Sequence, residues 1–250
     1  MSFSRRNLSW CLAAVVIAPL LAGLPSPALA QDYAAVVAAP DRSDADRQTD
    51  RRRDPVELLA FTGVRAGMTV LDMGAGGGYS TELLARVVGP SGKVYAQNAA
   101  DTNARAKERF EARIKTPAMK NVVPLVRPFD DPVPADVHDL DLITFFFFYH
   151  DTTYMPVDRA AMNKKLFAAL KKGGVLVIAD HSAKAGAGTS VGKTLHRIDE
   201  GALKSEVEAA GFRLVAEGGF LRHPEDTREE RIFASKTPVD EFVLKFQKPD

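Results

Sequence analysis

Two histidine–aspartate pairs follow apolar runs that the sequence predicts to be strands. His150 and Asp151 come after one run, and Asp180 and His181 come after the next. In open α/β sheets, ligands bind outside the carboxyl ends of the strands, so these four side chains are expected to meet at one edge. A histidine near neutral pH can remove a proton from a reacting group. His150 or His181 is therefore the candidate general base, oriented by Asp151 or Asp180.

A third group lies near the start of a helix predicted over residues 193–210. His196 and Asp199 are three residues apart, which would place them on one face of that helix, and His196 joins the catalytic candidates. Two alternatives stay open. An Asp–His pair at a strand end can simply cap the next element, and several imidazoles with a carboxylate can ligate zinc or iron. A metal-dependent enzyme would use His150, His181 and His196, although without H-x-x-x-H or C-x-x-C spacing no metal ligand is assigned.

A glycine-rich loop separates a predicted strand from a predicted helix. Asp72 stands at the strand end, and Gly74, Gly76 and Gly78 follow at every second position. Glycine permits backbone dihedrals that other residues avoid and lets a ligand lie against bare main chain, while the helix start presents free N–H groups. A dinucleotide-binding fingerprint would require a small residue at the position of Tyr79, so the loop favours another ligand.

The spacing of Asp72 and these glycines resembles the D-x-G-x-G-x-G motif of class I S-adenosylmethionine-dependent methyltransferases. The resemblance covers roughly residue 55 to the C-terminus, and it is similar in detail to bacterial methyltransferases that carry export signals. It implies an α/β, Rossmann-like fold with a seven-stranded, mostly parallel sheet of order 3-2-1-4-5-7-6 and helices on both faces. It also implies S-adenosylmethionine as the cofactor and methyl transfer to a small-molecule acceptor.

By position, the resemblance assigns cofactor binding to Asp72 and to the loop after it. The loop residues are Gly74, Ala75, Gly76, Gly77 and Gly78. Asn98 stands where the family has an acid for the ribose hydroxyls, and an amide makes such hydrogen bonds without the charge that strengthens them. Phe129 and Asp130 stand where the family packs and hydrogen-bonds adenine, although Asp before Pro132 is also typical of a turn. The Asn98 substitution leaves open an exported, non-catalytic nucleoside-binding protein.

The elements that position these residues alternate along the chain. Short apolar runs alternate with amphipathic stretches, which is typical of a parallel sheet covered on both faces. Parallel strands are predicted over residues 69–73, 93–97, 122–127, 140–147 and 175–180. An antiparallel pair is predicted over 212–221 and 241–246. Helices are predicted over 55–61, 80–88, 102–114, 159–171 and 193–210.

Residues 1–30 have the order of a secretory signal peptide. Arg5 and Arg6 precede an apolar run over 8–24, and small residues at 28–30 precede Gln31, as in a signal that is cleaved on export. Either the general secretory route or the twin-arginine route fits this segment. The sequence therefore predicts a periplasmic or secreted protein with no stable membrane anchor after cleavage.

The rest of the chain divides by composition. From residue 41 onward, the segment 31–54 alternates charges almost without apolar side chains. This pattern predicts a solvated linker or a frayed helix for residues 31–54. Residues 55–250 are the predicted methyltransferase-like domain. The formal net charge of the chain is +1, so no basic excess indicates a nucleic-acid partner. The expected partner is a small molecule, and the oligomeric state stays open.

Overall fold

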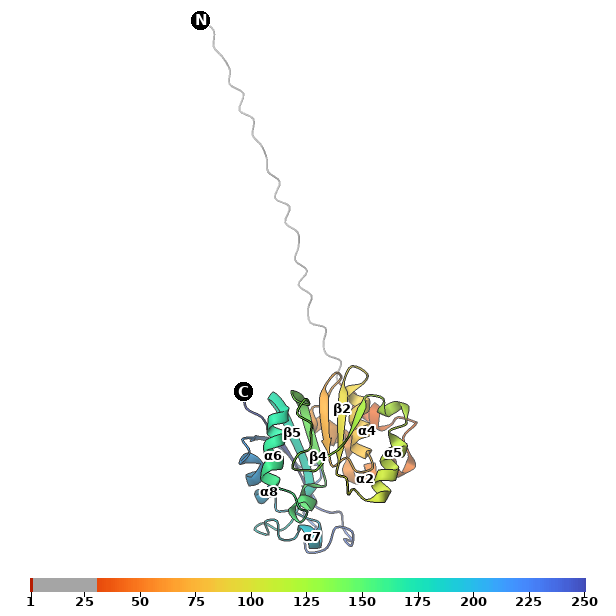
Figure 1. Ribbon diagram of the computed structural model, residues 1–250. Coiled ribbons are helices and arrows are strands. Elements are labelled where there is room, and N and C mark those ends of the chain that lie inside the picture. The colour runs from red at the N-terminus through yellow and green to blue at the C-terminus, as the bar shows by residue number, and fades with distance from the viewer. Residues whose placement is uncertain (2–30) are drawn as a thin grey trace. The chain divides into compact units, whose positions relative to one another are not determined.

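The structure, a computed structural model, describes residue 1 and residues 31–250, and Figure 1 shows its ribbon. The predicted signal peptide falls on residues 2–30 and lies outside the described residues, so export and the periplasmic or secreted location stay predictions. Gln31–Asp250 form one compact unit. Within the described part of the chain, no helix combines the length and the apolar character that crossing a membrane would require.

The sheet at the centre of this unit has the strand order β3-β2-β1-β4-β5-β7-β6. The strands are β1 (Thr69–Met73), β2 (Lys93–Asn98), β3 (Val122–Val126), β4 (Leu140–Phe146), β5 (Leu170–His181), β6 (Arg213–Gly218) and β7 (Glu241–Gln247). Strands β1 to β5 pair in parallel, and β7 pairs antiparallel with both β5 and β6. The predicted fold class, strand order and antiparallel edge pair are confirmed.

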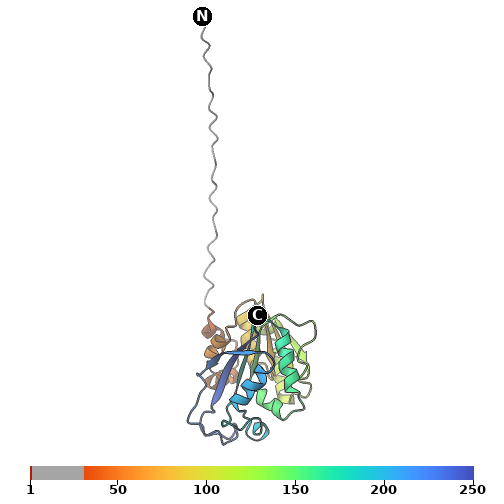
Figure 2. The same ribbon diagram turned by 90° about the vertical axis from the view of Figure 1, so that its left-hand side faces the viewer.

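Helices cover both faces of the sheet. They are α1 (Tyr33–Val37), α2 (Asp44–Arg53), α3 (Pro55–Thr62), α4 (Tyr79–Val88), α5 (Ala104–Arg113), α6 (Arg159–Ala169), α7 (Gly192–Leu195) and α8 (Glu200–Glu208), with the 3-10 helices η1 (Pro117–Met119) and η2 (Tyr149–Thr153). Successive strand residues point to opposite faces, so Leu142 joins the core under α3, α4 and α5, whereas Ile143 joins the core under α6 and α8. Figure 2 shows the N-terminal helices and α6 on opposite sides of the strands.

The helix predicted over 193–210 is broken, which corrects the expected placement of His196 and Asp199. His196 ends α7 in the left-handed region with φ 54°. Ile198 then pairs with Ser182 as an isolated bridge beside β5, and Asp199 begins α8 as its N-cap by accepting a hydrogen bond from the Gly201 N–H at 2.8 Å. His196 and Asp199 therefore belong to different elements and do not share a helix face.

The segment 31–54 forms α1 and α2, so it is helical, as one of the two expected alternatives held, and it is not a solvated linker. Its charges find partners within the fold: Arg42 makes two 2.7 Å hydrogen bonds to Asp50, and Asp46 accepts two 2.8 Å hydrogen bonds from Arg113 of α5. Tyr33 of α1 also donates to the carbonyl of Val64 at 2.8 Å. The compact unit therefore begins at Gln31, because ion pairs replace water around these side chains.

The Asp46–Arg113 pair gives a test of this docking. Replacing Asp46 with asparagine is expected to lower the free energy of unfolding by about 1–2 kcal/mol, because a partly buried Arg113 would lose one of its carboxylate partners. Urea denaturation measures the effect. Asp44→Asn, an exposed change on the same helix, is the control and should stay within about 0.5 kcal/mol. Equal losses in the two variants would contradict the docking of α2 through this pair.

Candidate active site

The loop between β1 and α4 has the backbone that its motif predicts. Gly74, Gly76 and Gly78 have φ of 61°, 55° and 83°, a region that residues with side chains rarely adopt. Space is a second constraint: a Cβ on Gly78 would lie 2.9 Å from Cδ of Arg113, and one on Gly74 would lie 3.3 Å from Cγ of Phe148. The loop therefore presents main chain without side chains.

A cavity of about 240 Å³ lies against this loop at the carboxyl ends of the strands. Among the predicted cofactor residues, Gly74, Gly76 and Asn98 line it, whereas Asp72 and Asp130 do not. Ala75, Gly77 and Gly78 also lie outside the lining. The remaining lining residues are Ala99, Asp101, Thr102, Asn103, Ala106, Phe129, Phe148, Asp151, Tyr154 and Met155.

Of the two residues expected at the adenine position, Phe129 lines the cavity and Asp130 does not. The ring of Phe129 is 2 % exposed and stacks on Phe148, with centroids 5.1 Å apart, and on Phe145 at 5.9 Å. Asp130 occupies the turn after it, as the alternative interpretation held. An aromatic wall, rather than a carboxylate, is therefore available on this side of the cavity.

Asp72 is buried beneath the loop and does not reach the cavity. It is 1 % exposed, and its oxygens accept hydrogen bonds from the hydroxyls of Thr144 at 2.8 Å, Thr81 at 2.6 Å and Ser80 at 2.9 Å. Burial raises the pKa of Asp72 despite these bonds. Its observed contacts tie the start of α4 to β4, so Asp72 shapes the loop instead of contacting a ligand.

Two amides at the end of β2 brace the glycine loop. Gln97 accepts a hydrogen bond from the Gly74 N–H at 2.9 Å and donates to the Arg127 carbonyl at 2.7 Å. Asn98 accepts from the Gly76 N–H at 2.8 Å and donates to the Gly76 carbonyl at 3.2 Å. Sequence reasoning placed Asn98 at the ribose and gave Gln97 no role. Both atoms of the Asn98 amide are engaged by the loop itself.

His150 is held between two aspartates, which corrects its assignment as the general base. Its ring Nδ1 lies 2.6 Å from Asp180 Oδ1, and its Nε2 lies 3.0 Å from Asp151 Oδ1. The His150 backbone N–H also donates to Asp180 Oδ2 at 2.7 Å. Burial alone would lower the pKa of His150, but the two carboxylates outweigh it and raise that pKa to about 10. His150 is therefore a cation near neutral pH with both ring nitrogens occupied.

His181 is the second candidate base, and it also lies behind the cavity wall. It is 3 % exposed, its ring centroid is 5.3 Å from that of His150, and its Nδ1 lies 2.9 Å from Glu241 Oε1. Burial lowers the pKa of His181 to about 3, so its ring is neutral. The ring is absent from the cavity lining, so His181 has no direct path to a ligand there.

Asp151 carries this network to the cavity wall. Its Oδ1 accepts hydrogen bonds from the Tyr154 hydroxyl at 2.5 Å and from His196 Nδ1 at 3.1 Å, besides the contact with His150. Burial opposes ionisation, yet the bond and charge of His150 lower the pKa of Asp151. Its Oδ2 makes no hydrogen bond to a described residue. This second oxygen of the ionised Asp151 carboxylate is therefore free at the cavity. His196, in turn, accepts a hydrogen bond at its Nε2 from Arg231 at 3.0 Å.

The same cluster contains donor atoms that can hold a cation. Those of His150, Asp151 and His196 lie within 4.8 Å of one another, as do those of His150, Asp180 and His181. Hydrogen bonds to Asp180 and Asp151 already occupy both ring nitrogens of His150. A cation at either group would thus replace a proton that now joins His150 to an aspartate.

Comparison with known proteins identifies the domain. The family described as a methyltransferase domain matches residues 45–217, a range that begins within α2 and ends in β6. Ubiquinone/menaquinone biosynthesis C-methyltransferase UbiE of Cronobacter sakazakii is 30% identical over 121 residues, 48% of this chain and 45% of that protein. UbiE of Pseudomonas paraeruginosa is 29% identical over 124 residues, which are 50% of this chain and 46% of that protein. The chain thus spans just under half the length of these relatives.

Solved structures share the fold. A SAM-dependent methyltransferase from Aquifex aeolicus superposes with a TM-score of 0.57 at 22% identity, covering 86% of this chain and 98% of that one. The [4+2]-cyclase SpnF superposes with a TM-score of 0.60 at 14% identity, covering 82% of each chain. At these identities the structural similarity shows a shared fold only. That fold is also found in SpnF, which is named as a cyclase and not as a methyltransferase.

The charge on His150 gives a pH-dependent test of the network. A folded-state pKa of about 10 exceeds the ordinary value of about 6.5. Protonation therefore stabilises the fold fully below about pH 6.5, and this contribution is lost as the pH rises toward 10. His150→Gln should lower the free energy of unfolding in urea by a few kcal/mol at about pH 6 and by much less at about pH 10.

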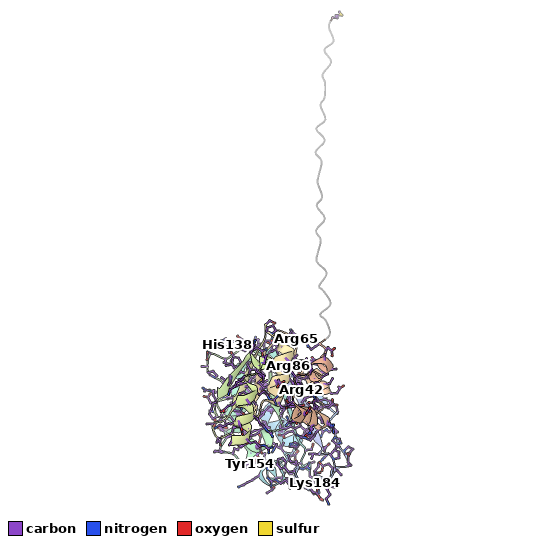
Figure 3. All side chains as sticks on the ribbon, turned by 90° about the vertical axis from the view of Figure 1, so that its right-hand side faces the viewer. Arg42, Arg65, Arg86, His138, Tyr154 and Lys184 are labelled. Atoms are coloured by element: carbon purple, nitrogen blue, oxygen red, sulfur yellow. The ribbon has the colours of Figure 1, made fainter. Side chains whose placement is uncertain are left out.

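The matched control for this experiment is His138→Gln. His138 is exposed and lies at the end of the sheet opposite to Tyr154, as Figure 3 shows. Its replacement should leave the free energy of unfolding nearly unchanged at both pH values. A gap between wild type and His150→Gln that is the same at both pH values would contradict a charged His150.

Proposed function

Because the chain belongs to the methyltransferase-domain family, we propose that it transfers a methyl group from S-adenosylmethionine to a small-molecule acceptor. One observation carries this proposal: a single cavity is lined by bare glycine backbone and by the Asp151 carboxylate. The fold alone would not carry it, since the same fold serves SpnF, a cyclase. The UbiE relatives, named for ubiquinone and menaquinone biosynthesis, support a small organic acceptor.

The cavity wall fits the parts of S-adenosylmethionine. The backbone of Gly74 and Gly76 leaves room that a Cβ on Gly74 would fill against Phe148. The half-buried Phe148 ring, which stacks on Phe129, offers an apolar surface for adenine. When bound, this cofactor supplies a methyl group on a sulfonium sulfur and leaves as S-adenosylhomocysteine.

Asp101 is the acid that can take the place of Asn98 toward the ribose. Asn98 uses both amide atoms on Gly76, whereas Asp101 follows three residues later and lines the same cavity beside Thr102. A carboxylate accepts hydrogen bonds from a diol more strongly than a neutral amide does. We therefore assign the ribose hydroxyls to Asp101 and the bracing of the loop to Asn98.

Asp151 is the group that receives the acceptor's proton. Its free Oδ2 can accept a hydrogen bond from an O–H or N–H group and so orient it in the cavity. An oxygen that gains a methyl group while keeping its proton becomes strongly acidic, so a carboxylate with a lowered pKa suffices as its base. His150 and Tyr154 hold Asp151 in place through its other oxygen.

Calorimetric titration with S-adenosylmethionine tests the cofactor site. Gly76→Arg is expected to abolish binding, because the side chain would enter the cavity that Gly76 lines. The control is Gly63→Arg: Gly63 has a similar φ of 74° and open space around its Cβ position, but it ends α3 away from the cavity. Wild-type protein that ignores the nucleoside, or equal affinities in wild type and Gly76→Arg, would refute the site.

Turnover tests the role of Asp151. Purified protein is incubated with S-adenosylmethionine carrying a deuterated methyl group and a small-molecule extract, and mass spectrometry detects the labelled product. Asp151→Asn keeps the shape but cannot take the proton, so the rate should fall about 10²- to 10⁴-fold with cofactor affinity unchanged. Asp139→Asn, a change at an exposed residue, should retain full activity. Undiminished labelling by Asp151→Asn would show that another group takes the proton.

A further inference from the structure

Two carboxylates line the cavity at the glycine loop, and no lysine or arginine of the described residues lines it with them. Asp101 follows β2 and Asp151 follows β4, and these strands flank β1 on opposite sides. The proposed function assigns Asp101 to the ribose hydroxyls. Asp151, Tyr154 and Met155 form the acceptor side of the cavity, where the Asp151 carboxylate is the charged group that a methyl acceptor meets.

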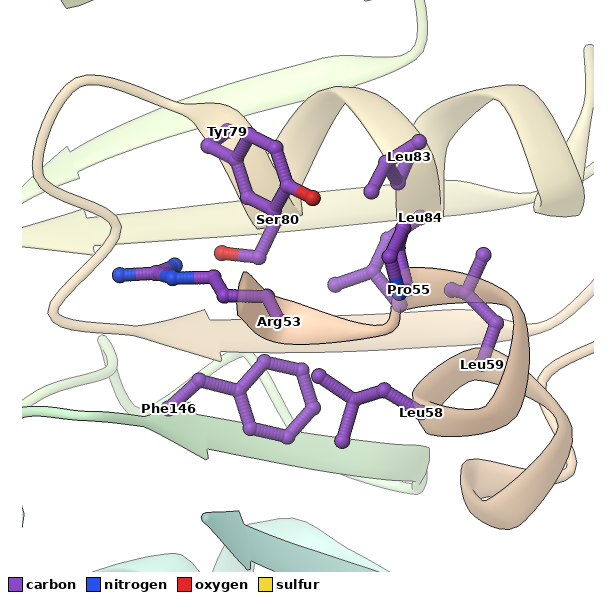
Figure 4. Close-up of a pocket in the computed structure, with 9 residues that line it drawn as sticks. All are labelled: Arg53, Pro55, Leu58, Leu59, Tyr79, Ser80, Leu83, Leu84 and Phe146. Atoms are coloured by element: carbon purple, nitrogen blue, oxygen red, sulfur yellow. The ribbon is translucent and has the colours of Figure 1, made fainter. Parts of the chain in front are cut away.

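Three cations around the site lie outside the cavity lining. His150 is buried behind Asp151, with its Nε2 3.0 Å from Asp151 Oδ1. Arg231 is exposed and donates to Nε2 of His196 at 3.0 Å. Arg53 lies in a separate apolar hollow between α3 and α4, as Figure 4 shows, and the volume of about 10 Å³ there has room for about one water. In the described part of the chain, no cationic side chain is therefore placed to contact a ligand on the acceptor side.

The hydrogen-bond donors of the acceptor side are already engaged. A tyrosine hydroxyl has one proton to donate, and that of Tyr154 goes to Asp151 Oδ1 at 2.5 Å. The backbone N–H groups of Asp151, Tyr154 and Met155 donate to carbonyls of the same segment at 3.0 to 3.3 Å. Oδ2 of Asp151 accepts no hydrogen bond from a described residue. The acceptor side therefore offers a ligand a negatively charged hydrogen-bond acceptor and no matching donor.

This pattern discriminates among ligands by charge. A carboxylate or phosphate would lose its hydration without gaining a donor, and it would face a like charge, which is costly. A hydroxyl group can donate its proton to Oδ2 of Asp151. A protonated amine can also pair with Oδ2, but its lone pair is occupied by the additional proton. Burial opposes ionisation of Asp151, yet His150 lowers its pKa, so Asp151 does not remove that proton and the amine binds without reacting.

The rest of the acceptor side is apolar. The Tyr154 side chain lines the cavity and is 40 % exposed, and Met155 lines the cavity and packs against the core. The Tyr154 ring stands edge-on to the His196 ring, with centroids 6.1 Å apart, while its hydroxyl is bound to Asp151. An aromatic ring held in this way offers a fixed apolar surface, so the part of the acceptor next to its hydroxyl group is expected to be apolar.

We infer that the methyl acceptor is an uncharged hydroxyl compound with an apolar body, and that its site excludes carboxylates and phosphates. The inference rests on the proposed function, because it names the class of compound that receives the methyl group. The hydroxyl group donates to Oδ2 of Asp151, and the apolar body lies against Tyr154 and Met155. As the acceptor oxygen gains the methyl group, the hydroxyl proton passes to Oδ2, and S-adenosylhomocysteine is the other product.

Three ligands of similar size and different charge test the selection. Benzyl alcohol, benzylamine and benzoate are titrated by calorimetry into the full chain saturated with S-adenosylhomocysteine. Wild type should bind benzylamine about 10- to 100-fold more tightly than benzoate, with benzyl alcohol between them. Asp151→Asn should remove most of this preference, whereas Asp139→Asn, at an exposed residue, should keep it. Benzoate bound by wild type as tightly as benzyl alcohol, or the same preference in wild type and Asp151→Asn, would overturn the inference.

A fractionated extract tests the acceptor itself. Ion exchange separates a small-molecule extract into anionic, cationic and neutral fractions, and each is incubated with the protein and S-adenosylmethionine that carries a deuterated methyl group. Labelled product is expected from the neutral fraction, and added benzylamine should reduce the labelling. Label confined to the anionic or the cationic fraction overturns the inference and leaves the proposed methyl transfer intact. Protein that binds no S-adenosylmethionine refutes the proposed function instead, and the three ligands titrated alone still test the charge of the cavity.

Discussion

The buried pair of Asp180 and His150 is the contact on which the site depends. Asp180 is the second-last residue of β5. One of its carboxylate oxygens binds the His150 ring, and the other binds the His150 backbone N–H. Together these bonds fix both the side chain and the main chain of η2 against the neighbouring strand. Asp151 follows directly, so the position of the carboxylate at the cavity wall is set by a residue that no ligand touches. The ion pair also keeps His150 charged, which in turn keeps Asp151 ionised.

Most of the fold could be predicted from the sequence because parallel strands are buried on both faces and read as apolar runs. The predicted run 69–73 coincides with β1, and the predicted runs for β2, β3 and β4 differ from the strands by one residue at the end. The two larger errors have a common cause. The charges of 31–54 and the break at His196 depend on partners distant in sequence, such as Arg113 for Asp46, and local patterns do not contain those partners.

Within the site, sequence could indicate which residues gather but not what each does. The topology of the sheet correctly brought His150, Asp151, Asp180 and His181 to one edge. Their roles depend on burial and on hydrogen bonds, which turned the expected base His150 into a fixed cation. Asp72 illustrates the same limit, since its motif position suggested a ligand contact while three hydroxyls from α4 and β4 satisfy it. Gln97 had no motif to reveal it.

The Asn98–Gly76 contact has a consequence for how the cavity behaves in different surroundings. An amide neither gains nor loses a proton across the range in which proteins stay folded, so the brace persists in acid, where an aspartate at the same place would lose its negative charge. The hydrogen bonds of Asn98 also hold the turn from within the chain, which lowers the entropy that binding would lose in rigidifying it. Acidification would therefore leave the Asn98 brace of the glycine loop intact, whereas the acceptor side of the cavity carries the ionised carboxylate of Asp151.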